Sequence, residues 1–280
     1  MGGALNRHGS ANPSAMQKVR LRYAKRGRLR FASHRDVARA FERGLRRAAV
    51  PMAHSRGFSP HPKISWLGAA PTGAASEAEY VELQLERPMD PAQLVAELRA
   101  ALVPGLDALE AVDAGPEALS DQLQASRWRV ELPGVPVDEL RAAVRLLLAA
   151  GRAEVQRMTK NGLRSFDARA ALLDAEVSRG PEDARGDVRP KNREPYGILG
   201  MVVRHTTPVV RPDDVLNALR VVADLALPAT ARAVRLEQGR LDDEGGLVDP
   251  FARDRATAGA RRGEPRRATG IGTDAVEPAV

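Results

Sequence analysis

The sequence predicts an α+β protein built from two consecutive units. Stretches of alternating apolar and polar residues, typical of strands, are separated by stretches of helical periodicity, and the order β-α-β-β-α-β occurs twice. That order is the one of the ferredoxin-like motif, in which an antiparallel sheet carries both helices on one face. A length of 280 residues also suits two domains. We therefore expect two tandem ferredoxin-like units with antiparallel sheets.

The first unit is predicted to span residues 16–115. Its expected strands cover residues 19–23, 29–32, 63–70, 79–86 and 106–112, and its expected helices cover residues 36–49 and 90–105. Ser33 is a candidate N-cap for the first helix, and Asp36 is the capping-box acid three residues later. Apolar residues recur at helical spacing and should face the core: Val37, Phe41, Leu45 and Ala48.

A linker over residues 116–126 leads to the second unit, predicted at 127–240. Its expected strands cover residues 128–132, 153–159, 163–171, 197–205 and 231–238, and its expected helices cover 137–150 and 211–222. Asn161-Gly162 is a strong hairpin-turn signal between two of these strands. Residues 174–177 are expected to extend that hairpin, and residues 180–195 to form a mobile charged loop.

Both ends of the chain are polar and rich in small residues. We expect residues 1–15 to be a disordered leader, with Met16 as an alternative start, and residues 241–280 to be a disordered tail. There is no apolar run of about 18 residues and no signal-peptide core, so we expect a cytoplasmic protein without membrane contact. The absence of cysteine excludes disulfides, a catalytic thiol and a cysteine-held cluster in this chain, and we expect no cofactor.

Positive charge is concentrated in residues 18–63. This segment holds fourteen Lys and Arg against two acids, a net charge of +12, whereas the whole chain carries +7 and the remainder therefore −5. Nucleotide bias can explain a preference for Arg over Lys, but it does not explain this segregation. Such a distribution is the electrostatic footprint of a polyanion-binding protein. The alternative is a solvated basic face without a ligand.

We expect the basic residues of the first helix to form a stripe opposite its apolar face, because they recur at spacings of three and four. Arg suits phosphate because its planar fork donates two parallel hydrogen bonds. Basic residues of the preceding strands are expected on a sheet face that is open or that meets the second unit. The predicted nucleic-acid contacts are Arg30, Arg35, Arg39, Arg43, Arg46, Arg47, Arg56, Phe58, His61 and Lys63.

The segment 54–63 is predicted to be a stiff loop with several donors. Gly57 permits a positive φ, and two prolines stiffen the end of the loop. Arg56, His61 and Lys63 would then be presented from a rigid support, a common design for binding sites. Phe58 either stacks on a base or packs into the core, and core packing is the favoured interpretation.

A catalytic role is a weaker hypothesis. The candidates for acid–base chemistry are His34, Asp36, His61 and Glu79. Pairing with the arginine-rich surface is the preferred role of Glu79 and of nearby Glu77. Three of the five histidines lie within 28 residues, yet no spacing matches a metal-ligand motif, so we predict no metal site.

Several short motifs between residues 28 and 80 resemble those of the radical SAM-linked protein family, a bacterial domain of unknown function. They are Arg30-Phe31, Ser33-His34-Arg35-Asp36, the run from Arg39 to Arg47, the segment from His54 to Lys63, and Glu79-Tyr80. The resemblance covers roughly residues 16–240 and is weak after residue 115. It implies a companion of a radical SAM enzyme, and because such an enzyme needs three closely spaced cysteines, this chain would be a stand-alone companion.

These observations lead to three hypotheses. The first is an RNA-binding accessory protein that works with a radical SAM enzyme in tRNA or rRNA modification. The second is an RNA-processing or RNA-modifying enzyme with an active site around His34, Asp36 and His61. The third is a protein–protein adaptor that touches no RNA.

Overall fold

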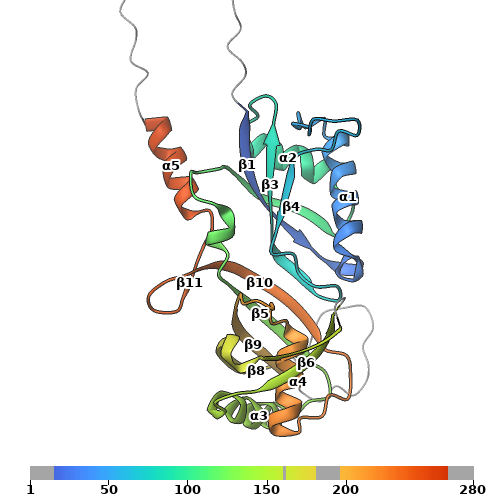
Figure 1. Ribbon diagram of the computed structural model, residues 1–280, viewed down its shortest axis with the longest axis vertical. Coiled ribbons are helices and arrows are strands. Elements are labelled where there is room, and N and C mark those ends of the chain that lie inside the picture. The colour runs from blue at the N-terminus through green and yellow to red at the C-terminus, as the bar shows by residue number, and fades with distance from the viewer. Residues whose placement is uncertain (1–15, 160–161, 181–195, 264–280) are drawn as a thin grey trace, which may run out of the picture.

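The computed structural model describes residues 16–159, 162–180 and 196–263, which form a mixed α+β fold (Figure 1). The strands are β1 (Gln17–Lys25), β2 (Ile64–Leu67), β3 (Ala75–Leu85), β4 (Leu106–Asp113), β5 (Ala125–Leu132), β6 (Glu154–Thr159), β7 (Gly162–Asp167), β8 (Leu172–Arg179), β9 (Gly197–Arg204), β10 (Arg232–Leu241) and β11 (Leu247–Val248). The α-helices are α1 (His34–Arg47), α2 (Pro91–Ala101), α3 (Val137–Ala149), α4 (Pro212–Ala223) and α5 (Ala252–Gly263). Short 3-10 helices are η1 (Gly27–Phe31), η2 (Leu119–Gln122) and η3 (Arg169–Ala171).

Nine strands form one open, mostly antiparallel sheet. Its main order is β4-β1-β3-β10-β5-β9-β8, with β2 paired to β3 and β11 paired to β10. The two halves of the chain meet where β3 and β10 pair in parallel, Ala75 opposite Val234 and Ser76 opposite Arg235. The sequence left the packing of the two units open, and this parallel contact joins the strands of both halves into one sheet.

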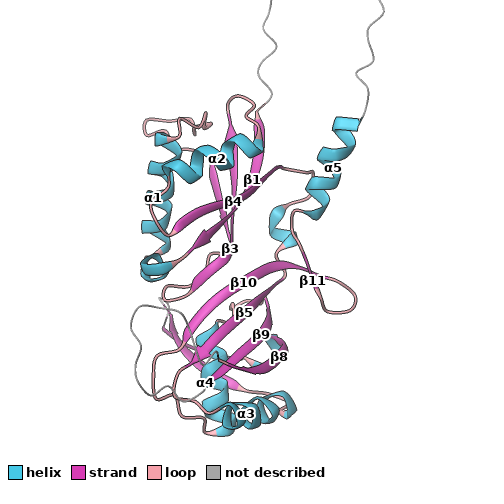
Figure 2. Cartoon of the chain, turned by 180° about the vertical axis from the view of Figure 1, so that it is seen from behind, coloured by secondary structure: helices cyan, strands magenta, loops and turns pink. Residues whose placement is uncertain are grey.

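Each half buries its own core between helices and sheet (Figure 2). In the first half, α1 and α2 pack on the inner residues of β1 and β3, including Leu21 and Leu83, both fully buried. In the second half, α3 and α4 pack on β5 and β9 around Val130 and Leu199. The segment after β2 contributes Ala70 to this second core, so the halves also share packing.

Three sequence predictions about secondary structure are wrong. The expected strand 29–32 is η1, because the amides of Leu29 and Ala32 bond to carbonyls three residues earlier, of Arg26 and Leu29. Residues 174–177 do not extend the β6–β7 hairpin, which forms a separate two-stranded sheet; they lie in β8 and pair with β9. Residues 247–263, expected to be disordered, form β11 and α5. The predicted leader 1–15 and the loop residues 181–195 lie outside the described residues.

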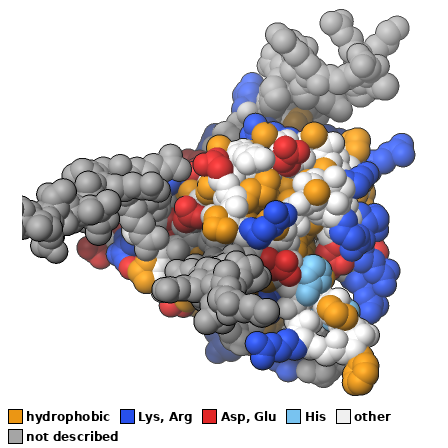
Figure 3. Space-filling view, turned by 90° about the horizontal axis from the view of Figure 1, so that it is seen from above, with side chains coloured by type: hydrophobic (Ala, Val, Ile, Leu, Met, Phe, Trp, Pro, Cys, Tyr) orange, Lys and Arg blue, Asp and Glu red, His pale blue; other side chains and the backbone are white. Residues whose placement is uncertain are grey.

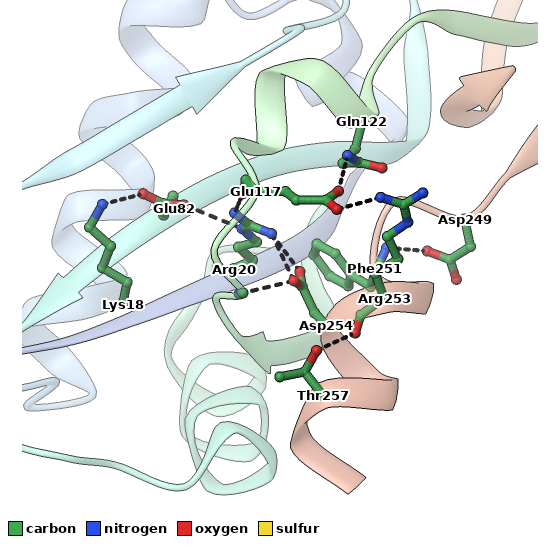
Figure 4. Close-up of polar contacts among 11 residues, drawn as sticks. Lys18, Arg20, Glu82, Glu117, Gln122, Asp249, Phe251, Arg253, Asp254 and Thr257 are labelled. Carbon is green, nitrogen blue, oxygen red and sulfur yellow. Dashed lines mark hydrogen bonds and ion pairs between the residues drawn. The ribbon is translucent and has the colours of Figure 1, made fainter. Parts of the chain in front are cut away.

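The sheet face of the first half that lies opposite α1 and α2 is not open. Phe251, at the start of α5, is fully buried against Tyr80 of β3 with ring centroids 5.4 Å apart. Arg20 of β1, expected on a face that is open or that meets the second unit, is buried and paired with Asp254 of α5 (Figure 4). Basic residues of β1 therefore do not form an open platform there. None of the helices within the described ranges is long and apolar enough to cross a membrane.

Candidate nucleic-acid interface

The helix α1 carries the first part of the candidate site. Ser33 caps it as predicted: its Oγ accepts the amide of Asp36 at 3.2 Å and donates to the Asp36 carboxylate at 2.7 Å. The predicted apolar face is confirmed, with Val37, Phe41 and Leu45 buried. The opposite face exposes five arginines, which we call the α1 arginines: Arg35, Arg39, Arg43, Arg46 and Arg47.

The α1 arginines have no carboxylate partner among the residues that the structure describes. The same holds for Arg28, Arg30, Arg56 and Lys63 nearby. Some other arginines, such as Arg20 and Arg235, are held in buried ion pairs. Figure 3 shows Lys and Arg side chains gathered along the edge of the molecule on which α1 lies in Figure 1. An exposed cation without an internal partner is available to an external anion.

The segment 54–63, which we call the 54–63 loop, is fixed at its base. His54 and Pro62 form an isolated β-bridge, and the amide of Ser55 donates to the carbonyl of His61 at 2.8 Å. The His61 amide in turn donates to Ser55 Oγ at 3.0 Å. The tip between these residues is exposed, and Gly57 adopts a φ of 133°, which side chains rarely tolerate. This base supports the predicted stiffness of the loop.

Phe58 lies at the tip of this loop and is fully exposed, with a relative accessibility of 111%. The favoured prediction of core packing is therefore wrong, because no element within the described residues covers the tip. Phe31, at the end of η1, is also 60% exposed and lies under the guanidinium of Arg30, 4.6 Å from the ring centroid. Phe31 was not predicted to be a site residue, since its alternation with arginines suggested a strand.

A shallow hollow of about 620 Å³ lies at the C-terminal end of α1. Arg47 and Arg87 line it together with the start of α2, and Asp90 and Glu97 add acidic groups. Asp90 caps α2 by accepting the amides of Ala92 and Gln93. The hollow therefore has mixed charge and is not a continuation of the α1 arginines.

The four catalytic candidates do not form one site. His34 and Asp36 lie at the N-terminal end of α1, where the His34 ring packs edge-on against Trp66 with centroids 5.4 Å apart. His61 follows the other end of this 14-residue helix, which is about 21 Å long. Glu79 is buried in β3. Among the described residues, no group of three or more His, Asp or Glu is placed to hold a metal ion.

Glu79 has a structural role at the junction of the two halves. It pairs with Arg235 of β10 and accepts the amide of Ala70 at 3.2 Å. Both Glu77 and Glu79 were expected to pair with the arginine-rich segment. Glu77 does so through Arg26, whereas Glu79 pairs with Arg235 of the second half. Lys25 is also buried here, and burial lowers its pKa although Glu79 opposes the change.

These observations define an α+β protein with an exposed, unpaired arginine surface beside an exposed aromatic loop. A family model described as "Uncharacterized protein conserved in bacteria" (DUF2344) matches residues 18–212. The chain belongs to this family. The matched range includes α1 and the 54–63 loop.

Other comparisons add little. No curated protein matches the chain. A crystal structure of an unknown protein from Galdieria sulphuraria is 12% identical, covering 79% of this chain and 99% of that one at a TM-score of 0.24. A Rhodococcus jostii RHA1 DypB variant in complex with heme is 13% identical, covering 85% and 97% at a TM-score of 0.19. Similarity at these TM-scores supports no conclusion about fold or function.

Proposed function

We propose that this protein is a cytoplasmic RNA-binding accessory protein that works with a radical SAM enzyme in tRNA or rRNA modification. RNA binding is proposed because the α1 arginines are exposed and have no carboxylate partner in the described part of the chain. A surface that is only solvated does not need this concentration of positive charge, because scattered charges of both signs keep a protein in solution equally well.

Phosphate groups suit this surface in two ways. Five guanidinium groups on one helix can each donate two parallel hydrogen bonds to phosphate oxygens. The 54–63 loop adds Arg56, His61 and Lys63 from a fixed base beyond the C-terminal end of the same helix. A nucleic-acid backbone that follows α1 would therefore contact cations from one end of the helix to the other.

Electrophoretic shifts with total tRNA and rRNA at two salt concentrations test this proposal. We expect binding that weakens steeply with salt, since each neutralised phosphate releases counterions. Arg39→Gln combined with Arg43→Gln should weaken binding and lower the salt dependence by a slope of about 0.7 per lost contact to a single strand. The absence of salt-sensitive binding, with or without the partner enzyme, would overturn the proposal.

The matched control is Arg141→Gln combined with Arg145→Gln. These residues have the same spacing on α3 in the second half and are also exposed, so the loss of charge is identical. We expect this control to bind RNA like the wild type. Equal losses in both double variants would indicate an unspecific effect of net charge.

The link to a radical SAM enzyme is supported by the resemblance of the motifs between residues 28 and 80 and by the absence of cysteine. A chain without cysteine cannot supply the thiolates that hold the cluster of such an enzyme. Co-purification from the native cell, before and after nuclease treatment, tests the link. Retention of the enzyme without any RNA would favour the adaptor hypothesis instead.

We also infer that each half is a ferredoxin-like unit. In the first half the strand order is β4-β1-β3-β2, and in the second half it is β10-β5-β9-β8. In both, the last strand lies beside the first, the third strand follows, and all of these neighbours are antiparallel. The β6–β7 hairpin would then be an insertion in the second unit. Separate expression of the halves, with folding followed by circular dichroism, tests this inference.

A further inference from the structure

The exposed ring of Phe58 is unusual for this protein. Phe41 and Phe251 are fully buried, and Phe166 packs against the second core, whereas Phe58 makes no ring or cation contact within the described residues. The base of its loop is held by a β-bridge and by main-chain hydrogen bonds, so the ring is presented outward by an ordered support. An exposed aromatic ring beside cations is a typical stacking platform for a base.

The spacing of the groups limits the form of the RNA. Phe58 follows the C-terminal end of α1 and Phe31 precedes its N-terminal end, so about 21 Å of arginine-bearing helix separates the two exposed rings along the chain. In an RNA duplex the faces of the bases are stacked on one another and are closed to a protein ring. Bases are free to stack on aromatic side chains in single-stranded loops, bulges and ends.

We propose that the RNA bound by this protein is single-stranded at the site, with its phosphates along the α1 arginines and one base stacked on Phe58. This inference rests on the proposed function and specifies its substrate class. Phe31, whose ring lies against the Arg30 guanidinium, provides a second stacking surface at the opposite end of the helix.

Fluorescence anisotropy with a labelled 12-nucleotide RNA, single-stranded or annealed to its complement, tests the inference. We expect the single strand to bind at least about tenfold more tightly than the duplex. Phe58→Ala should weaken single-strand binding about tenfold, the usual size of one base–aromatic contact, and leave the salt dependence unchanged. Phe58→Trp keeps an aromatic ring and should bind like the wild type. The fluorescence of the added tryptophan should be quenched when the complex forms.

The control is Leu146→Ala, which removes another exposed apolar side chain (54% exposed) from α3. It should bind like the wild type. If duplex and single strand bind equally, or if Phe58→Ala binds like the wild type, this inference is overturned while salt-sensitive binding still supports the proposed function. If neither RNA binds, the proposed function fails as well. If Phe58→Ala impairs only association with a partner protein, the ring is a protein contact and the inference is again overturned.

Discussion

Arg20 of β1 and Asp254 of α5 form a buried ion pair although they lie 234 positions apart in the sequence. Arg20 Nη1 donates to Asp254 Oδ1 and Oδ2 at 2.9 and 2.7 Å, and the amide of Gly115 donates to the same carboxylate at 2.9 Å. This contact fixes α5 over the sheet face of the first half. It explains why a segment rich in small and polar residues is ordered there.

Loss of this pair should destabilise the protein. Asp254→Ala leaves the Arg20 guanidinium buried, with Glu82 at 3.3 Å as its remaining carboxylate, and we expect about 3 kcal/mol lower free energy of unfolding. Arg253→Ala, in the same helix, breaks an exposed pair with Glu117 and should cost less than about 1 kcal/mol. Urea unfolding measures the free energy of unfolding of both variants. Equal losses would show that the buried pair stabilises the protein no more than the exposed pair.

The Glu79–Arg235 pair should stabilise the junction of the two halves. Glu79→Gln removes the carboxylate that is paired with the buried Arg235 and that also favours the charged form of the buried Lys25, and we expect a loss of about 3 kcal/mol. Adding Lys25→Met should recover part of this loss, because it removes one uncompensated cation. Additive effects in this double-mutant cycle would contradict a coupled cluster. The control is Glu77→Gln in the same strand, whose pair with Arg26 is partly exposed and should contribute less than about 1 kcal/mol.

His205 should make the protein less stable in mild acid. Its Nδ1–H donates to the carbonyl of Leu123 at 2.8 Å, and its Nε2 lies 2.7 Å from Ser126 Oγ. Burial lowers the pKa of His205 below its ordinary value of 6.5. The unfolded chain therefore binds the proton more readily than the folded protein, so stability falls as pH drops from 6.5 towards the folded pKa.

Urea unfolding at several pH values between about 7.5 and 5 measures this dependence. His205→Asn should be less stable than the wild type at the upper end, because it loses hydrogen bonds, but its stability should change less with pH. His54→Asn, at an exposed histidine in the 54–63 loop, controls for the loss of an imidazole as such. Parallel pH profiles for the wild type and His205→Asn would refute the assignment.

Ser33 should stabilise the helix that presents the arginines. Ser33→Ala removes the acceptor for the Asp36 amide, and we expect a loss of about 1 kcal/mol. Ser33→Asp, which keeps an acceptor at the cap, should retain most of the stability. Ser65→Ala, at an exposed serine of β2, is the control and should be close to neutral. Thermal unfolding followed at 222 nm compares the three variants, and a neutral Ser33→Ala would show that the cap is dispensable.

Local interactions made parts of this protein predictable from its sequence. The N-cap at Ser33, the buried face around Phe41 and the exposed face with Arg39 and Arg43 depend on residues three or four positions apart, so helical spacing reveals them. The segregation of charge is likewise a property of the sequence itself. These features identified the helix and the loop of the candidate site, but not their ligand.

Tertiary structure decided which side chains are covered. Glu79 is buried because Arg235, 156 residues later, approaches it where β3 meets β10, and Arg20 is buried because α5 returns over β1. Phe58 is exposed because no segment of the described chain packs on it. Burial depends on which distant segment arrives at a given position, and short-range periodicity carries no information about that segment. The sequence by itself therefore determined where the cations lie along the chain. The fold determined that those of α1 are exposed without a carboxylate partner among the described residues, whereas Arg20 and Arg235 are buried in ion pairs.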